Sequence, residues 1–332
     1  QDEYFRANAL SALAQKLPEL LPEALAAARA IQSESKRANA LSDLAQKLPP
    51  ELLPEALAAA RAIQDEYFRA NALSALAQKL PELLPEALAA ARAIHYDDFR
   101  AYTLSALAQK LPELLPEALA AARAIQSESK RANALSDLAQ KLPPELLPEA
   151  LAAARAMQSE LNRAYALSAL AQKLPPELLP EALAAARAMQ SELNRAYALS
   201  ALAQKLPPEL LPKALAAARA IQSESNRAKA LSVLAQKLPP ELLPEALAAA
   251  RAIQHEHSRA EALSALADSL SQMPSTKLFP LWQDTLHELS LRTRPNLLQD
   301  IKVLFPVIFA LGGKAATVEI ARAIVDVARW WK

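Results

Sequence analysis

The chain has 332 residues, among them 37 Lys or Arg, 36 Asp or Glu, two glycines and no cysteine. The balanced charge argues against nucleic acid or an acidic membrane surface as a partner, and the lack of cysteine excludes disulfides and thiolate metal sites, which fits a cytoplasmic location. No apolar run approaches the roughly 20 residues of a membrane span, and no signal peptide heads the chain.

The first 31 residues, QDEYFRANALSALAQKLPELLPEALAAARAI, return unchanged at 64–94. Further copies with few changes begin at Gln32, His95, Gln126, Gln158, Gln190 and Gln222, and a ninth copy begins at Gln254 and soon diverges. This pattern predicts eight tandem repeats over residues 1–253, followed by a divergent ninth repeat and a C-terminal cap over residues 254–332. Because Gln1 lies inside the pattern and no methionine precedes it, we expect a piece of a longer protein.

Each repeat predicts a helical hairpin. Helix A is expected over about the first 17 positions, with Asp2, Ser33 or Asp65 as its cap, and the proline after Leu17 ends it. Helix B is expected to begin near Pro22, a suitable first helical position. The repeats are 31 or 32 residues long, and the extra residue is always the second proline of LPPEL. An insertion confined to one place marks the turn between the two helices.

Apolar side chains recur at spacings of three and four on both helices, which gives each helix one buried face. One hairpin cannot cover this face alone, so it must stack on its neighbours. The expected fold is therefore all-α, a right-handed α-solenoid of tandem 31–32-residue helical hairpins with a helical cap. In the first repeat the expected core residues are Leu10, Leu13, Leu17, Ala7 and Ala14 on helix A and Leu21, Leu25 and Ala28 on helix B.

The differences between repeats gather at positions 1 to 5, 8 and 12. Of these, positions 1, 5, 8 and 12 lie close together on the side of helix A opposite the leucines. Drift on a solvated face would explain them, but such drift should yield charged residues more often than rings, and all six tyrosines lie in this set. Exposed rings along a concave surface are typical of recognition surfaces. The candidate partner-binding residues are Tyr4, Phe5, Tyr67, Phe68, Tyr96, Phe99, Tyr102, Tyr165, Tyr197 and Lys229.

Two arginines recur in the repeats, one at Arg6 and its equivalents and one at Arg29 and its equivalents. They could form a ladder for phosphate or carboxylate groups. The favoured interpretation is structural, because Arg6 and its equivalents start helix A close to the C-terminal carbonyls of the preceding helix B, where a cation is stabilised.

The sequence lacks the residue patterns of an enzyme or a metal site. Gly312, Gly313 and Lys314 have neither the spacing nor the preceding strand of a phosphate-binding loop. His255 and His257 are two residues apart and so point to different sides of a helix, unlike a zinc-binding i, i+4 pair. We therefore expect no catalysis, no metal and no cofactor.

From Asp268 the pattern changes to a segment that predicts three helices, at 278–291, 295–311 and 314–331, with Gly312 between the last two. Such a segment would cover the end of the array, whereas the open face of the first repeat could stack end to end on another molecule. The cap is expected to pack through Phe279, Trp282, Phe305, Phe309, Trp330 and Trp331.

Tandem hairpins of this length resemble the tetratricopeptide superfamily, although they are shorter than its usual 34 residues and lack its signature Trp and Gly. The phrases RANALSALAQKLPELLPEALAAARAI and LLQDIKVLFPVIFALGGKAA more closely resemble the C-terminal repeat arrays of bacterial NACHT-type signalling ATPases of the STAND class. This resemblance implies the sensor end of a larger protein that binds a protein or peptide through the concave face of its A helices. The alternative is a purely structural or engineered scaffold without a ligand.

Overall fold

The computed structural model describes residues 2–14, 17–109 and 111–330, and every element in these residues is helical. The side chains of Asp2 and of residues 327–330 lie outside the description, as do Gln1 and Trp331. The expected roles of Asp2 as a helix cap and of Trp330 and Trp331 in the cap therefore fall outside the described residues.

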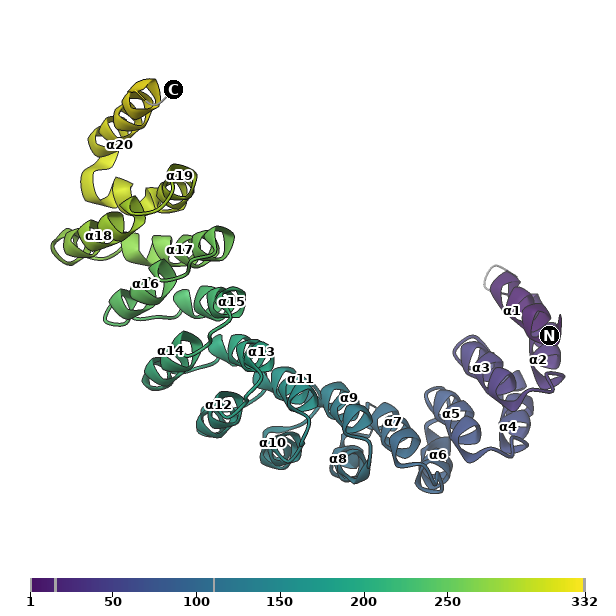
Figure 1. The fold of residues 1–332 in the computed structure, drawn as a ribbon. Helices are drawn as coiled ribbons and strands as arrows, with labels where there is room; N and C mark the ends of the chain where they lie inside the picture. The colour runs from purple at the N-terminus through teal and green to yellow at the C-terminus, as the bar shows by residue number, and fades with distance from the viewer. Residues whose placement is uncertain (1, 15–16, 110, 331–332) are drawn as a thin grey trace. The chain divides into compact units, whose positions relative to one another are not determined.

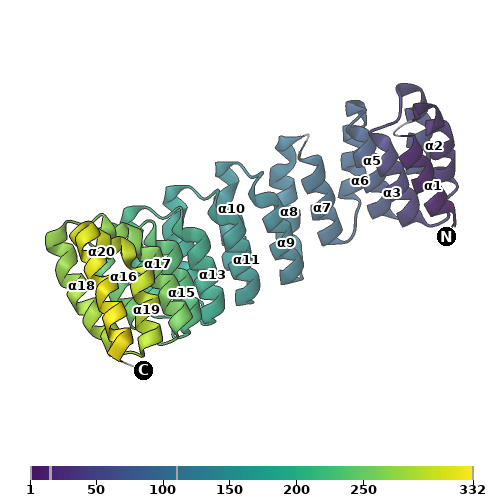
Figure 2. The same cartoon turned by 90° about the horizontal axis from the view of Figure 1, so that it is seen from above.

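The chain divides into two compact bodies, residues 1–153 and 154–332. In each body the repeats are helical hairpins whose A helices form one layer and whose B helices form a second layer (Figure 1). Figure 2 shows the helices from another side, standing next to one another within each body. Each A helix contacts the next A helix of its body, as α7 contacts α9 and α13 contacts α15. The predicted tandem hairpins are confirmed.

The first body holds the A helices α1 (Asp2–Leu13), α3 (Glu34–Ala45), α5 (Glu66–Ala77), α7 (Asp97–Leu107) and α9 (Glu128–Ala139), and the B helices α2 (Leu21–Arg29), α4 (Leu53–Arg61), α6 (Leu84–Arg92) and α8 (Leu115–Ala124). Helix α10 (Leu147–Arg155) runs across the boundary. The second body holds the A helices α11 (Glu160–Ala171), α13 (Glu192–Ala203), α15 (Glu224–Ala235) and α17 (Glu256–Ser271), and the B helices α12 (Leu179–Arg187), α14 (Leu211–Arg219) and α16 (Leu243–Arg251).

The A helices end about three residues earlier than the sequence predicts. In the second repeat α3 ends at Ala45, and a 3₁₀ turn at Pro50–Leu52 leads into α4. A residue that precedes a proline is forced out of the helical region. Leu17 accordingly has φ −129° and ψ 85°, while in the longer repeats the first proline is extended, with φ −72° and ψ 160° at Pro49. Helix B begins within one residue of the predicted position, at Leu21 and Leu53.

The predicted leucine stripe forms the core of the inner repeats, except that Leu80 and Leu111 are only partly buried, but it does not form the core of the first repeat. Leu44 and Leu48 are each 1% exposed, whereas their equivalents Leu13 and Leu17 are 53% and 47% exposed. In the second repeat α3 contacts both α1 and α2 of the first repeat. The prediction of a buried stripe was wrong for Leu13 and Leu17.

The recurring arginines are structural, as the sequence analysis favoured. Arg37 donates from Nη1 to the carbonyl of Ile31 at 2.8 Å, and the equivalents Arg69 to Arg259 make the same bond to the last residue of the preceding repeat. Arg29 and most of its equivalents pair with a glutamate of the next helix B, as Arg61 does with Glu86 at 2.7 Å. Lys213 stands at that position after Arg187, and Arg251 pairs with Glu288 instead. These cations bridge consecutive repeats and are not a free ladder for anions.

A second link between repeats escaped the sequence analysis. The glutamate at position 3 of one repeat accepts hydrogen bonds from the first two amides of the next repeat: Glu160 accepts from the backbone N–H groups of Gln190 and Ser191, both at 2.7 Å. These bonds lower the pKa of Glu160. Because free amides begin every helix, the carboxylate serves as a capping group supplied by the neighbouring repeat. Glu34, Glu192 and Glu224 make the same pair of bonds.

Helices α18 (Ser275–Ser290), α19 (Arg294–Val303) and α20 (Phe305–Trp330) form the C-terminal segment, and all three contact the last array helices α16 or α17. The predicted second helix, 295–311, is broken at Leu304, because Pro306 cannot donate an amide to a continuing helix. The kink near the predicted stop lies at Gly313, whose φ of +56° suits glycine. Of the expected packing rings, Phe279, Phe305 and Phe309 are about half exposed, and Leu278, Leu289, Leu304, Val307 and Ile308 are buried instead.

A fully buried ion pair joins the cap to the array. Arg259 of α17 donates from Nε to Oδ2 of Asp300 on α19 at 2.7 Å, and both side chains have 0% exposure. Burial raises the pKa of Asp300, and the hydrogen bond from Arg259 opposes this rise. In other repeats the equivalent arginine pairs with the glutamate three residues before it, as Arg195 does with Glu192. For Arg259, an aspartate of the C-terminal segment thus takes the place of the local glutamate as the ion-pair partner.

Within the described residues, no single helix is long and apolar enough to cross a membrane. Helix α19 and residues 305–326, which meet at a bend of 79°, pass this test of length and composition only as a pair.

Candidate partner-binding site

The variable positions 4 and 5 face each other across consecutive A helices of the first body. The Lys36 ammonium lies 5.4 Å from the centre of the Tyr4 ring, and the Tyr67 and Phe99 rings stack at 4.2 Å. Asp98 pairs with Lys130 at 2.6 Å. Each pair joins position 4 of one repeat to position 5 of the next, so these substitutions match each other chemically across the junctions.

This matching changes the interpretation of several candidate residues. Tyr4, Tyr67 and Phe68 are only partly exposed, so their rings are not fully available to a partner. The stack with Phe99 covers part of the Tyr67 ring. The missed signal lay in comparing position 4 of each repeat with position 5 of the next repeat. Phe5, Tyr96 and Phe99 remain 66%, 68% and 38% exposed.

Position 8 differs, because its tyrosines form no such pairs in the described residues. Tyr102, Tyr165 and Tyr197 are 57%, 42% and 52% exposed, and none has a ring or hydrogen-bond partner among the described residues. Lys229, at the same position of the eighth repeat, is also exposed. Tyr102 belongs to the first body and the other three residues belong to the second.

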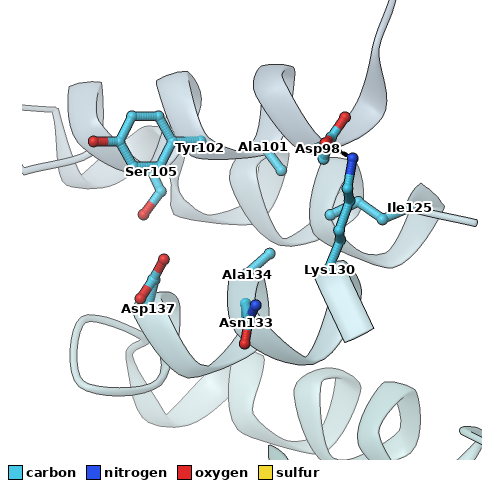
Figure 3. A pocket seen from close by; sticks show the side chains of 9 residues that line it. All are labelled: Asp98, Ala101, Tyr102, Ser105, Ile125, Lys130, Asn133, Ala134 and Asp137. Carbon is cyan, nitrogen blue, oxygen red and sulfur yellow. Dashed lines mark hydrogen bonds and ion pairs between the residues drawn. The ribbon is translucent and has the colours of Figure 1, made fainter. Parts of the chain in front are cut away.

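A cavity of about 160 Å³ opens between α7 and α9 beside Tyr102. Its walls follow two helical stripes with spacings of three and four, and the side chain of Ile125 also lines it (Figure 3). From α7 come Asp98, Ala101, Tyr102 and Ser105, and from α9 come Lys130, Asn133, Ala134 and Asp137.

The two ends of the cavity differ in charge. At one end Asp98 and Lys130 neutralise each other, and the hydrogen bond from Lys130 lowers the pKa of Asp98. At the other end the carboxylate of Asp137 points across the cavity toward Ser105, on the side where Tyr102 lies (Figure 3). In the described part of the chain no hydrogen bond or ion pair holds Asp137. Lys141, one turn further along, donates to Ser105 Oγ at 3.3 Å.

Of the two histidines in the ninth repeat, His255 has a structural role. The Nδ1 atom of His255 accepts a hydrogen bond from the backbone N–H of Ser258 at 3.3 Å and so caps α17. Within the residues that the structure describes, no three His, Asp or Glu side chains come close enough together to hold a metal ion.

No family model and no curated protein matches this chain. Solved structures do match its fold. Kap121p bound to RanGTP is 15% identical over 99% of this chain and 42% of that chain, with a TM-score of 0.57. The karyopherin Kap121p bound to the extreme C-terminus of the protein phosphatase Cdc14p is 14% identical over 97% of this chain and 42% of that chain, with a TM-score of 0.61. This chain therefore shares a helical-repeat fold with Kap121p and spans 42% of its length.

Proposed function

We propose that this chain is a non-catalytic recognition array that binds a protein or peptide through the exposed side chains of its A helices. The observation that carries the proposal is the contrast between the variable positions. Positions 4 and 5 form matched pairs between repeats, which gives them a structural purpose. The rings at position 8 have no ring or hydrogen-bond partner among the described residues and stay about half exposed. Large exposed rings without such a structural partner are typical of binding surfaces.

The fold comparison is consistent with this proposal. The Kap121p structures hold RanGTP, the C-terminus of Cdc14p or the SUMO protease Ulp1p, all of them proteins. Helical repeats expose a long layer of parallel helices, which suits an elongated protein ligand. The competing proposal is a structural scaffold on which the rings arose by drift.

Photo-crosslinking distinguishes these two proposals. A photoreactive phenylalanine analogue replaces Tyr102, Tyr165 or Tyr197 in cells of the source organism, and the matched control carries it at Ala184, which is exposed on helix α12. We expect the three A-helix positions to crosslink to the same protein and the control not to do so. Equal crosslinking from Ala184, or no recurrent product from the three sites, would refute the recognition proposal.

A triple variant then measures the contribution of the rings. Changing Tyr102, Tyr165 and Tyr197 to alanine should weaken binding of the crosslinked partner by at least about 30-fold, because one hot-spot ring contributes about 2 kcal/mol. Circular dichroism at the same temperature should show an unchanged helix content. If the folded triple variant binds that partner as tightly as the wild type does, the rings are drift.

The finer proposal places this array at the sensor end of a larger signalling protein of the STAND class in the cytoplasm. Its support is the resemblance of the repeat phrase and of the C-terminal segment to such arrays. Sequencing the source gene upstream of the codon for Gln1 tests it. A nucleotide-binding module encoded there would support the proposal, and an open reading frame without one would contradict it.

A further inference from the structure

Two nearly identical repeats provide an internal comparison for the cavity. Residues 32–62 and 126–156 have the same sequence, so Asp43 and Asp137 occupy equivalent positions. The repeats before them differ: position 8 holds Asn8 in the first repeat and Tyr102 in the fourth. The carboxylate therefore faces a ring-bearing repeat only at the junction of α7 and α9.

Asp137 is placed where its own helix does not stabilise it. It lies in the last turn of α9, near the unpaired carbonyls, where a negative charge is unfavourable and a cation is favoured. No basic residue occupies that turn. Lys141 lies just beyond the helix and donates to Ser105 rather than to Asp137. Most other repeats have alanine at this position, as at Ala75 and Ala169.

The wall around Asp137 has the chemistry of a cation site. Tyr102 offers a ring that is 57% exposed, and the negative face of an aromatic ring attracts an ammonium or guanidinium group. Asp137 supplies the full negative charge that a cation needs when it leaves water. Asn133, between the two ends of the cavity, can both donate and accept a hydrogen bond. An anionic ligand would instead meet an unpaired carboxylate.

We propose that this cavity binds the side chain of a lysine or arginine in an extended segment of the partner protein. The charged end lies between Tyr102 and Asp137, and the Asn133 amide bonds the partner's backbone. The inference rests on the proposed function and names the chemistry of the ligand: a basic peptide.

Fluorine NMR on the full chain tests this proposal without the natural partner. The six tyrosines are replaced by 3-fluorotyrosine, and Tyr102→Phe identifies the Tyr102 resonance. The probes are acetylated, amidated pentapeptides with a central arginine or lysine between glycines. Matched probes carry citrulline or norleucine, which have similar shapes and no charge. We expect a saturable shift of the Tyr102 resonance with the basic probes only.

Matched variants locate the charge. Asp137→Asn should lower the association constant by at least about tenfold, the effect expected for loss of one charged hydrogen-bond partner. Asp43→Asn, in the identical second repeat, should leave it unchanged. Asn8→Tyr places a ring opposite Asp43, and its added fluorine resonance should respond to the basic probes.

The proposal would be overturned if the Tyr102 resonance did not shift with either basic probe up to about 10 mM, a range that includes weak single contacts. Equal shifts with the neutral probes, or equal effects of Asp43→Asn and Asp137→Asn on the association constant, would also overturn it. So would an Asn8→Tyr variant whose added fluorine resonance does not respond to the basic probes. Failure here together with successful crosslinking from Tyr102 would leave the recognition function intact and refute only the basic ligand. Failure of crosslinking alone would refute the wider function.

Discussion

The buried ion pair between the array and the cap leads to a quantitative prediction. Arg259 and Asp300 have no exposed side-chain surface, and Nε lies 2.7 Å from Oδ2. The same guanidinium donates to the carbonyls of Ile253 and Gln254 at 3.0 and 2.9 Å. An arginine does not deprotonate inside a protein, so Asp300→Ala would leave a buried cation without its counter-charge. Such a loss costs about 3–5 kcal/mol.

An exposed pair in the same cap provides the control. Arg322 and Glu319 lie 2.6 Å apart on α20, with side chains 68% and 69% exposed. Solvent screens such pairs, so Glu319→Ala should change stability by less than about 1 kcal/mol. Replacing both buried charges, as Arg259→Met with Asp300→Leu, should recover most of the loss, because two apolar groups need no counter-charge.

Native-state hydrogen exchange is the suitable assay, because repeat arrays open locally and a single melting temperature does not isolate the cap. The opening free energy of the amides of α19 should fall by about 3–5 kcal/mol in Asp300→Ala. The amides of α5, in the first body, should exchange as in the wild type. A change within about 1 kcal/mol in α19, similar to that of Glu319→Ala, would show that water reaches the pair and would refute the reasoning.

Three further predictions follow from the links between repeats. Backbone amides lower the pKa of Glu160 and of Glu224 below the usual 4.5, so the stability that these carboxylates contribute is present above about pH 4.5 and is lost as the pH falls through the folded pKa. In denaturant titrations, the free energy of unfolding of the Glu160→Gln, Glu224→Gln variant should therefore fall less with decreasing pH than that of the wild type, and an equal fall would contradict this. Lys213 stands where other repeats have the glutamate that pairs with the arginine of the preceding repeat, which in this case is Arg187. Lys213→Glu should raise the free energy of unfolding by about 0.5 kcal/mol, more than Lys213→Gln does, and equal gains would show that no ion pair forms. Amides of α1 should exchange faster than those of α5, whose sequence is the same apart from its ends, because Leu13 and Leu17 are uncovered; equal protection of the monomer would refute that explanation.

The hairpin fold could be predicted from the sequence because its causes are local. The spacing of Leu41, Leu44 and Leu48 follows the helical period, and these leucines are buried as expected. Proline lacks an amide wherever it stands, so the turn before Pro50 follows from the sequence. The bond from Arg37 to the carbonyl of Ile31 was also predictable, because the two residues are only six positions apart.

The candidate site depended on contacts between residues about 32 positions apart, which no local pattern reveals. Tyr4 and Tyr67 lie in identical repeats, but Tyr4 meets Lys36 whereas Tyr67 stacks on Phe99. The exposure of a ring is thus set by the neighbouring repeat, and this is why the sequence grouped half-buried Tyr67 with exposed Tyr102. In the same way, Asp43 and Asp137 share one sequence context but face Asn8 and Tyr102 respectively.

The sequence alone determined the helices, their buried faces and the turn between them, since backbone geometry and hydrophobic periodicity act over a few residues. Only the tertiary structure decided which variable side chains pair with each other and which remain free, because packing of one repeat on the next brings these side chains together. The burial of Asp300 against Arg259 belongs to the same class. The charge of Asp300 is acceptable there only because a distant helix supplies the guanidinium.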